Sequence, residues 1–328
     1  MSGLKIGIVG ATGLVGQELI SIIDRSDLVA DDIRFFASER SSGISLNFRE
    51  QEIPVAELYE DTSLNLDYLF FCTCPFISEM FIPVFSKRGI VCIDNSSRYR
   101  LQDDVPLVVP EINPQALEGH KNIIANPNCS TIIALMALMP LHEAFELSGF
   151  CVSTYQAVSG AGRDGISALM DDLNGDHEVS METFGHQIAF NALPKIGEID
   201  GERYSGEEKK MCNESRKILS DSKLRISAMC VRVPVMRAHS MSIFASFKRP
   251  INLKQAEDAL EQNENVNFYG ENSFPCPLDM SGRNPCAIGR LRLDTFLENG
   301  LSMWVVGDQI RKGAALNAFQ IMLALERL

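Results

Sequence analysis

Short apolar runs alternate with segments of helical periodicity over the first third of the chain. Leu4 to Val9 is an apolar run, and the residues from Glu18 to Ile23 follow a glycine-rich turn at helical spacing. Further apolar runs at 68–72 and 90–94 flank a helical segment at 77–88 that contains a proline. Continuous apolar runs are typical of buried parallel strands joined by crossover helices. The pattern predicts an α/β domain built on a parallel sheet.

Beyond Leu147 the pattern changes to longer segments with period two. The segments 151–158 and 239–247 alternate apolar and polar residues, as half-buried strands do. The segment 225–235 reads as a strand in which Arg232 interrupts an apolar run, and 301–306 as one more strand. A chain of 328 residues also exceeds what one hydrophobic core usually holds. We therefore expect a second, sheet-bearing α+β domain after the parallel one.

The glycine-rich turn after the first strand has the spacing G-x-x-G-x-x-G, from Gly10 through Gly13 to Gly16. Small residues there let the backbone approach a pyrophosphate, which binds at the N-terminus of the following helix. The position of this turn at the first strand–helix junction predicts a dinucleotide site. The alternative is a turn that only allows tight helix–strand packing.

The second strand ends in Ser38-Glu39-Arg40-Ser41-Ser42-Gly43. An arginine flanked by serines suits a 2'-phosphate, because it offers charge-assisted hydrogen bonds. NADP is therefore the preferred cofactor, although the carboxylate of Glu39 would repel that phosphate if it pointed inward.

Cys129 lies in Asn126-Pro127-Asn128-Cys129-Ser130-Thr131, between a short strand and a helix. A helix N-terminus favours a thiolate, which is the nucleophilic form of cysteine. A buried, unreactive cysteine is the alternative, because a nucleophile needs partners. Later strands supply candidates: Gln156 on an otherwise mostly apolar face, Arg232 within an apolar run, and His239 at the head of a strand.

Composition limits the partners. A formal net charge of -13 and a pI near 4.9 argue against non-specific binding to nucleic acid or to an anionic membrane. No apolar run is long enough to span a bilayer. The nine cysteines lack paired C-x-x-C spacing and no signal peptide precedes them, so we expect reduced thiols, no metal site and a cytoplasmic location.

Nine motifs in one order resemble those of the aspartate-semialdehyde dehydrogenase family nearly from end to end. They are GATGLVGQE, SERSSG, DNSSRYR, VPLVVPEIN, NPNCSTI, YQAVSGAG, GEEKK, VRVPVMRAHS and RKGAALNAFQI. The resemblance implies a Rossmann-type NADP-binding domain at residues 1–127 with a returning helix at 309–328. It implies a catalytic and dimerisation domain at 128–308.

The resemblance also implies roles for individual residues. Cys129 is the nucleophile, His239 the acid/base, and Gln156 positions the thiohemiacetal. The substrate-binding residues are Arg232 for the carboxylate, Arg100 and Lys210 for the phosphate, Glu208 for the amine, and Asn95; Glu207 is a neighbouring alternative to Glu208. The expected cofactor-binding residues are Gly10, Thr12, Gly13, Leu14, Val15, Gly16, Ser38, Arg40, Ser41, Ser159, Gly160 and Asn317.

Three positions depart from the family pattern. Glu39 is unusual beside the 2'-phosphate residues, and Arg98 adds a charge beside the expected substrate phosphate. Asp308-Gln309 replaces the more usual Asp-Asn, a difference that we expect to change little.

The implied reaction is NADPH-dependent reductive dephosphorylation of L-4-aspartyl phosphate to L-aspartate 4-semialdehyde, through a thioacyl intermediate on Cys129. It belongs to aspartate-family amino-acid biosynthesis, and the family forms homodimers or homotetramers. The alternatives are an N-acetyl-γ-glutamyl-phosphate reductase, whose substrate has no ammonium group, and a non-catalytic homologue that binds a dinucleotide or a partner protein.

Overall fold

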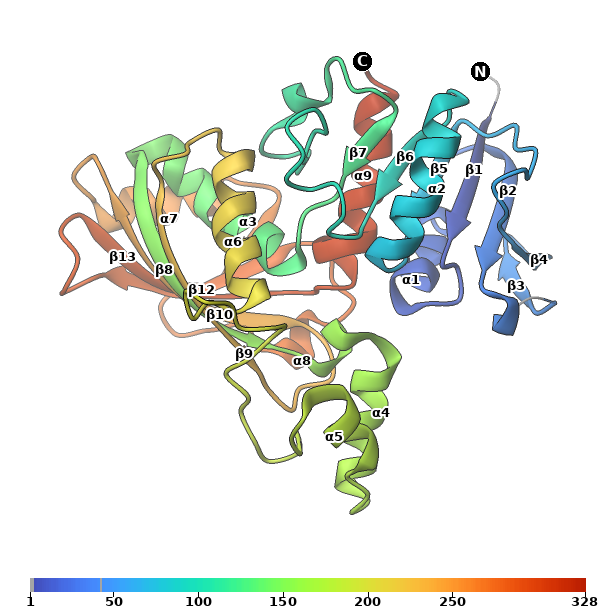
Figure 1. Ribbon diagram of the computed structural model, residues 1–328. Coiled ribbons are helices and arrows are strands. Elements are labelled where there is room, and N and C mark those ends of the chain that lie inside the picture. Colours follow the sequence, from blue (N-terminus) through green and yellow to red (C-terminus); the bar gives the residue numbers. More distant parts are fainter. Residues whose placement is uncertain (1–2, 42) are drawn as a thin grey trace. The chain divides into compact units, whose positions relative to one another are not determined.

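The computed structural model describes residues 3–41 and 43–328, and it divides the chain into two compact units (Figure 1). One unit contains residues 1–128 and 314–328, and the other contains residues 129–313. The sequence-based boundaries were 127/128 and 308/309. Ser42, part of the motif after the second strand, lies outside the described residues.

The first unit is built on a seven-stranded sheet in the order β3-β4-β2-β1-β5-β6-β7. All neighbouring strands are parallel except β3 and β4, which form an antiparallel hairpin at the edge. The strands are β1 (Leu4–Val9), β2 (Ala30–Ala37), β3 (Ser45–Phe48), β4 (Gln51–Glu57), β5 (Tyr68–Phe71), β6 (Val91–Asp94) and β7 (Ile123–Ala125). The expected parallel α/β sheet is therefore confirmed.

Three α-helices complete this unit: α1 (Leu14–Asp24), α2 (Pro75–Lys87) and α9 (Leu316–Leu325). The C-terminal helix α9 lies beside α1 and β6, and so returns to the unit with which the chain began (Figure 1). Its apolar residues Phe319, Ile321 and Met322 join the same buried cluster as Ile6 and Phe35.

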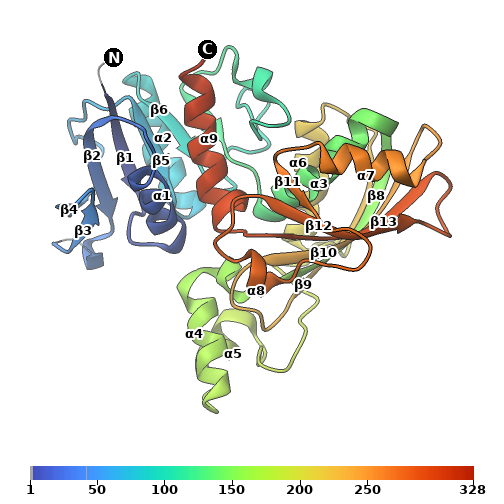
Figure 2. The same cartoon turned by 180° about the vertical axis from the view of Figure 1, so that it is seen from behind.

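The second unit contains a six-stranded mixed sheet in the order β11-β12-β13-β10-β8-β9. The strands are β8 (Leu147–Gln156), β9 (Arg225–Arg232), β10 (His239–Phe247), β11 (Val266–Phe268), β12 (Cys286–Leu293) and β13 (Gly300–Gly307). Helices α3 (Cys129–Phe145), α6 (Gly206–Ile218) and α7 (Leu253–Glu261) lie along one face of this sheet (Figure 2). Helix α3 is buried on nearly every side, which explains why its sequence is almost entirely apolar.

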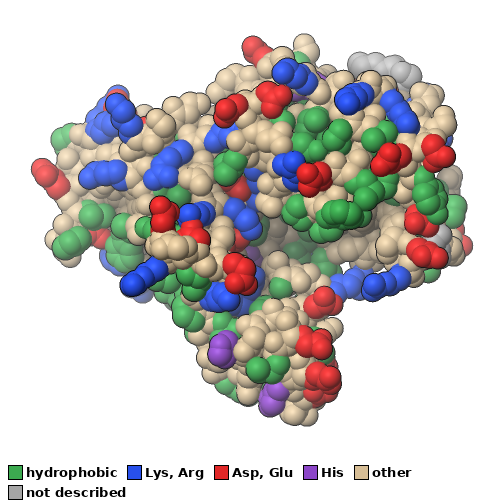
Figure 3. Space-filling view, viewed as in Figure 1, with side chains coloured by type: hydrophobic (Ala, Val, Ile, Leu, Met, Phe, Trp, Pro, Cys, Tyr) green, Lys and Arg blue, Asp and Glu red, His purple; other side chains and the backbone are tan. Residues whose placement is uncertain are grey.

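Two further helices, α4 (Gly162–Leu173) and α5 (Glu178–Phe184), project from the second unit around a small core of their own. The buried carboxylate of Asp172 holds this projection together, because it accepts hydrogen bonds from Ile188 N (2.7 Å), Ala189 N (2.9 Å) and Ser180 Oγ (3.0 Å). Acidic side chains line one edge of the projection in the space-filling view (Figure 3). A short helix, α8 (Pro277–Met280), lies near β13.

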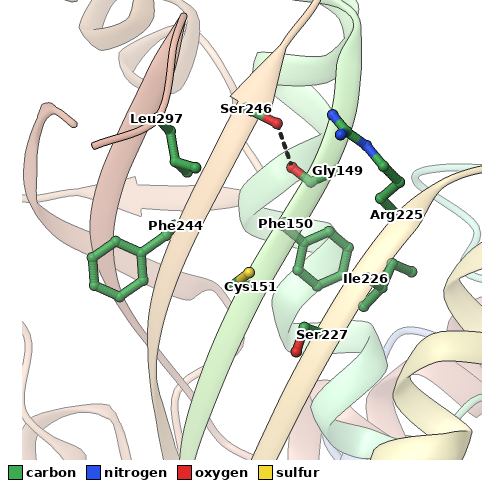
Figure 4. A pocket seen from close by; sticks show the side chains of 9 residues that line it. All are labelled: Gly149, Phe150, Cys151, Arg225, Ile226, Ser227, Phe244, Ser246 and Leu297. Atoms are coloured by element: carbon green, nitrogen blue, oxygen red, sulfur yellow. Dashed lines mark hydrogen bonds between the residues drawn. The ribbon is translucent and has the colours of Figure 1, made fainter. Parts of the chain in front are cut away.

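The opposite face of the six-stranded sheet exposes apolar side chains. Tyr155, Met229 and Phe244 are 38%, 50% and 37% exposed, although they lie in the middle or at the end of regular strands. A cavity of about 270 Å³ lies on the sheet, and Gly149, Cys151, Arg225 and Phe244 are among the residues that line it (Figure 4). An exposed apolar patch on a strand face indicates an interaction surface.

Candidate active site

Cys129 is the first residue of α3, so its thiol lies at the positive end of a 17-residue helix. The backbone at Gly313 approaches it closely: a Cβ atom added at Gly313 would lie 2.8 Å from the Cβ of Cys129. The expected strand–turn–helix setting is present, because β7 ends at Ala125 and Asn126 to Asn128 form the connection. This setting favours a thiolate.

Gln156 and Arg232 are the last residues of β8 and β9, and they are paired in register. Both side chains are buried, and they leave the sheet on the face that α3 and α6 cover. Thr154 Oγ1 donates to Gln156 Oε1 (3.0 Å), and Gln156 Nε2 donates to Glu207 Oε1 (3.2 Å). These two bonds fix the orientation of the amide, so its nitrogen faces the site.

Arg232 donates from Nη1 to Ala157 O at 2.6 Å. Burial lowers the pKa of its guanidinium, whereas the nearby Glu207 and Cys129 act in the opposite direction. Its guanidinium also stacks over the ring of Phe184, 6.0 Å from the ring centroid. A buried guanidinium held in this way is suited to binding a carboxylate.

His239 is fully buried at the start of β10. Ala157 N donates to its Nδ1 (3.1 Å), so the proton of the neutral ring lies on Nε2. Burial, followed by the charge of Arg232, lowers the pKa of His239 to about 3, which keeps the ring neutral at pH 7. Its Nε2 lies 3.4 Å from Gln156 Nε2. Two N–H donors that converge in this way can bind one oxyanion.

The first turn of α6 separates the roles of two neighbouring glutamates. Glu208 forms a capping box with Ser205 and accepts a hydrogen bond from Cys230 N (3.1 Å). Glu207 instead contacts Gln156 and Lys210, whose Nζ lies 3.2 Å from Glu207 Oε2. Of the two expected alternatives, this geometry favours Glu207, because the carboxylate of Glu208 already caps the helix. Which of the two glutamates binds the substrate amine stays a prediction.

Ser159 and Gly160 lie in the turn after β8 (Val158–Ala161). A Cβ atom at Gly160 would lie 2.6 Å from Arg232 Nη1 and 3.4 Å from His239 Nε2. A side chain at this position would therefore require the guanidinium of Arg232 to shift. Ser159 Oγ donates to Met236 O (2.5 Å), which ties the turn to the segment before β10.

The first unit contains a cavity of about 670 Å³ at the carboxyl ends of its parallel strands. Of the expected cofactor residues, Gly10, Thr12, Gly13, Ser38 and Arg40 line it, and so does Glu39. Sequence reasoning missed several others, which follow the ends of β4 and β5 or lie on α2: Leu58, Thr73, Ile77, Met80 and Phe81. Ligands bind at this edge in open α/β sheets, and the volume of the cavity is typical of small-molecule and cofactor sites.

The remaining residues of the glycine motif are not among those that line this cavity. Leu14 and Val15 open α1, and a Cβ atom at Gly16 would lie 2.2 Å from Gly10 O, so Gly16 allows close packing of α1. Ser41 accepts a hydrogen bond from Thr12 Oγ1 (3.4 Å). Gly10 has a φ of 81°, and a side chain there would meet Cys72 O.

Three buried or half-buried amides form a chain in the first unit. Asn126 Nδ2 donates to Asn95 Oδ1 (2.9 Å), and Asn317 Nδ2 donates to Asn126 Oδ1 (2.7 Å) and to Val108 O (2.9 Å). These bonds hold the connection that leads to Cys129. Asn317 is fully buried, which supports a structural role for it; contact with the cofactor or substrate stays a prediction for Asn317 and Asn95.

The two arginines of DNSSRYR differ. Arg100 is buried and donates from Nη2 to Asn95 O (2.7 Å), whereas Arg98 pairs with Glu79 at the surface (2.9 Å). The charge of Arg98 is therefore paired with that of Glu79, and its contribution beside the substrate phosphate stays a prediction. In residues 3–41 and 43–328 no cluster of three or more potential metal ligands occurs, and no helix is long and apolar enough to cross a membrane.

One unit contains a dinucleotide-type sheet, and the other places a glutamine, an arginine and a histidine at the ends of strands beside the helix that begins at Cys129. This combination is typical of a dehydrogenase. The family model described as semialdehyde dehydrogenase, NAD binding domain, matches residues 5–120, and the one described as semialdehyde dehydrogenase, dimerisation domain, matches residues 138–312. Together with the relatives below, these matches show that the chain belongs to the aspartate-semialdehyde dehydrogenase family.

Full-length relatives carry the same name. The chain is 42% identical to an aspartate-semialdehyde dehydrogenase of Aquifex aeolicus, with 97% of each sequence covered. A structure of aspartate semialdehyde dehydrogenase II complexed with ASA from Vibrio cholerae has a TM-score of 0.96 at 36% identity, with 100% of this chain and 99% of that one covered. A structure of the Candida albicans enzyme with NADP has a TM-score of 0.81 at 26% identity, with 99% of each chain covered.

Proposed function

We propose that the chain catalyses the NADPH-dependent reductive dephosphorylation of L-4-aspartyl phosphate to L-aspartate 4-semialdehyde. The observation that carries this proposal is the cluster of Gln156, Arg232, Glu207 and His239 on the sheet face beneath α3, whose first residue is Cys129. An acyl phosphate with an α-amino and an α-carboxylate group needs a nucleophile, a cation and an anion. The cluster supplies all three.

The reaction proceeds in two parts. Cys129 thiolate attacks the acyl carbon and phosphate leaves, which produces a thioester on the cysteine. NADPH, when bound, supplies the hydride. The N–H groups of Gln156 and His239 stabilise the negative charge that develops on the substrate oxygen, and collapse of the thiohemiacetal then releases the aldehyde and the thiolate.

Substrate recognition follows from the charges in the site. Arg232 binds the α-carboxylate. Glu207 binds the α-ammonium group, because the carboxylate of Glu208 is already used by Ser205 N and Cys230 N. Lys210 and Arg100 bind the phosphate. Glu207 is buried, and a buried carboxylate is suited to a cationic substrate group. The N-acetylated substrate of the rival reductase would leave this charge without its proposed partner.

NADP is the proposed cofactor. Arg40 and Ser38 line the first-unit cavity where the adenosine ribose of a bound dinucleotide would lie. The NADP complex of the Candida albicans relative supports this choice. Glu39 lines the same cavity, and its carboxylate opposes the 2'-phosphate.

A homodimer is the proposed assembly. The match to a dimerisation domain and the exposed apolar face of the six-stranded sheet support it. Phe244, Met229 and Tyr155 would become buried there. A homotetramer and a cytoplasmic location stay predictions from the sequence.

The test uses the purified chain in the reverse direction, with aspartate semialdehyde, NADP⁺ and inorganic phosphate. We expect formation of NADPH that depends on phosphate, and its loss in Cys129→Ala, which should still bind NADP⁺. Activity that occurs only with N-acetylglutamate semialdehyde would assign the rival reductase instead. Absence of activity with both substrates, beside intact NADP⁺ binding, would indicate a non-catalytic homologue.

A further inference from the structure

The residue before His239 has a strained backbone. Ala238 has a φ of 71°, in the left-handed region that residues other than glycine rarely adopt. It is fully buried, and β10 begins at the next residue. A strained residue persists only where its surroundings hold it in place. The residues around Ala238 therefore determine the position of the His239 backbone.

Gln309 holds this residue from one side. Its Oε1 accepts a hydrogen bond from Ala238 N (2.8 Å), and its Nε2 donates to Ser159 Oγ (2.6 Å). Ser159 Oγ donates in turn to Met236 O (2.5 Å). One buried amide thus connects the turn that contains Gly160 with the segment that leads to His239.

Asp308 holds the same segment from the other side. Its Oδ2 accepts from Arg237 Nε (2.6 Å) and Gly282 N (2.6 Å), and its Oδ1 accepts from Ile310 N (2.9 Å) and Arg311 N (3.0 Å). The carboxylate is fully buried. Asp308 follows Gly307, the residue of β13 that pairs with His239. Asp308 and Gln309 therefore extend from the strand next to the histidine.

The histidine has little space in which to move. Ala157 N fixes its Nδ1, and the Gly160 backbone lies close enough that an added Cβ would be 3.3 Å from its Cε1. Gln156 Nε2 lies 3.4 Å from its Nε2. A rotation at Ala238 would move the backbone of His239 and separate these two N–H groups.

We propose that Asp308 and Gln309 are positioning residues that hold Ala238 in its left-handed conformation and so fix the place at which His239 presents Nε2. This inference rests on the catalytic role proposed for His239. Neither side chain is required to touch the substrate. The side chain of Gln309 is long enough to bond to Ala238 N and Ser159 Oγ together.

The first experiment compares Gln309→Met, which keeps the length of the side chain but removes both polar atoms, with wild type. We expect kcat to fall about 100-fold, as for a small misplacement of a catalytic group. The NADP⁺ dissociation constant and the rate of Cys129 alkylation by iodoacetamide should not change. A loss confined to NADP⁺ affinity, or an unchanged kcat, would overturn the proposal.

Relief of the strain provides a rescue. Glycine adopts a positive φ without penalty, so Ala238→Gly in the Gln309→Met background should restore kcat by about tenfold. No recovery in the double variant would show that Gln309 does not act through Ala238, and would also overturn the proposal.

A matched pair of carboxylates tests Asp308. Asp294 accepts from Phe296 N and Leu297 N (both 2.8 Å) at the other end of β13, far along the strand from Gly307. Asp294→Asn should lose stability and keep kcat, whereas Asp308→Asn should lower kcat. Equal kcat values for the two variants would contradict a positioning role.

A histidine NMR titration needs no turnover and so separates this proposal from the proposed function. In wild type, burial and then the charge of Arg232 lower the pKa of His239, whereas the charge of Glu207 raises it. In Gln309→Met we expect its pKa to rise toward the ordinary value of about 6.5. If wild type lacked dehydrogenase activity while Gln309→Met still showed the rise in the pKa of His239, the positioning role would stand and the proposed function would fail. An unchanged titration would overturn the positioning role.

Discussion

Gln156 and Arg232 end two parallel strands in register, so their side chains leave the sheet side by side on the same face. Neighbouring groups already use part of their hydrogen-bonding capacity: Thr154 and Glu207 orient the amide, and Ala157 O accepts from Arg232 Nη1. The guanidinium can hold a backbone carbonyl and a substrate carboxylate at once because it has several donors in a fixed plane.

This geometry predicts the effect of Arg232→Lys. Lysine keeps the charge but lacks the planar fork, so it cannot bind both Ala157 O and a carboxylate. We expect the KM for aspartate semialdehyde to rise by roughly 10- to 100-fold, the equivalent of one charge-assisted hydrogen bond of about 1.5–3 kcal/mol. Steady-state kinetics measure this change. A KM equal to that of wild type would assign the carboxylate to another cation.

The two glutamates of α6 predict opposite effects of the same substitution. Glu207→Gln removes the charge proposed to bind the substrate ammonium, so the KM should rise roughly 10- to 100-fold with little change in stability. Glu208→Gln weakens the helix cap, so it should cost about 1 kcal/mol of unfolding free energy and leave the KM unchanged. Kinetics and urea unfolding of both variants check this. The reverse pattern would restore Glu208 as the amine ligand.

The choice between these glutamates shows how far the sequence could lead. Resemblance to family motifs placed both residues near the site but did not distinguish their roles. The distinction comes from the capping box that Glu208 forms with Ser205, three residues earlier. The signal was present, because S-x-x-E is a helix-start pattern and Glu207 and Lys210 share a helix face at i, i+3. Neither feature shows the bond from Cys230 N, because β9 lies far along the chain.

The fold was predictable where burial is uniform. Apolar runs such as Tyr68–Phe71 identified the parallel strands, because both faces of those strands are buried. The β3–β4 hairpin at the sheet edge was missed, because its short strands mix polar with apolar residues and are about half exposed. The strain at Ala238 also left no sequence signal, since residues other than glycine rarely adopt a positive φ and an alanine does not indicate one.

Gly160 is expected to tolerate no side chain. In Gly160→Ala the new Cβ would lie 2.6 Å from Arg232 Nη1, so the guanidinium must move. We expect kcat/KM to fall about 100-fold, as for a misplacement of about 1 Å. Gly201→Ala is the control, because nothing lies within 4 Å of its added Cβ. A Gly160→Ala enzyme with wild-type kcat/KM would show that Arg232 can shift without consequence.

Glu39 and Arg40 should control the choice between NADP and NAD. Both line the first-unit cavity, and Arg40 is the cation proposed for the 2'-phosphate. Arg40→Ala should weaken NADP⁺ binding by roughly tenfold or more and leave NAD⁺ unaffected, whereas Glu39→Ala should strengthen NADP⁺ binding. Isothermal titration with both dinucleotides measures the ratio. If neither substitution altered it, the 2'-phosphate would bind elsewhere.

Acid should destabilise the protein partly through His239. Its pKa is about 3 in the folded chain, because of burial and then Arg232, and about 6.5 in an unfolded chain. Between these values the unfolded chain binds one more proton, so the free energy of unfolding falls as the pH falls through this window, and this residue has no effect above it. The contribution to the slope is at most about 1.4 kcal/mol per pH unit. Urea unfolding of wild type and His239→Gln from neutral to acid pH measures this slope. The free energy of unfolding should fall less steeply with pH in the variant, since glutamine does not titrate. Parallel slopes would show that His239 is already protonated in the folded state.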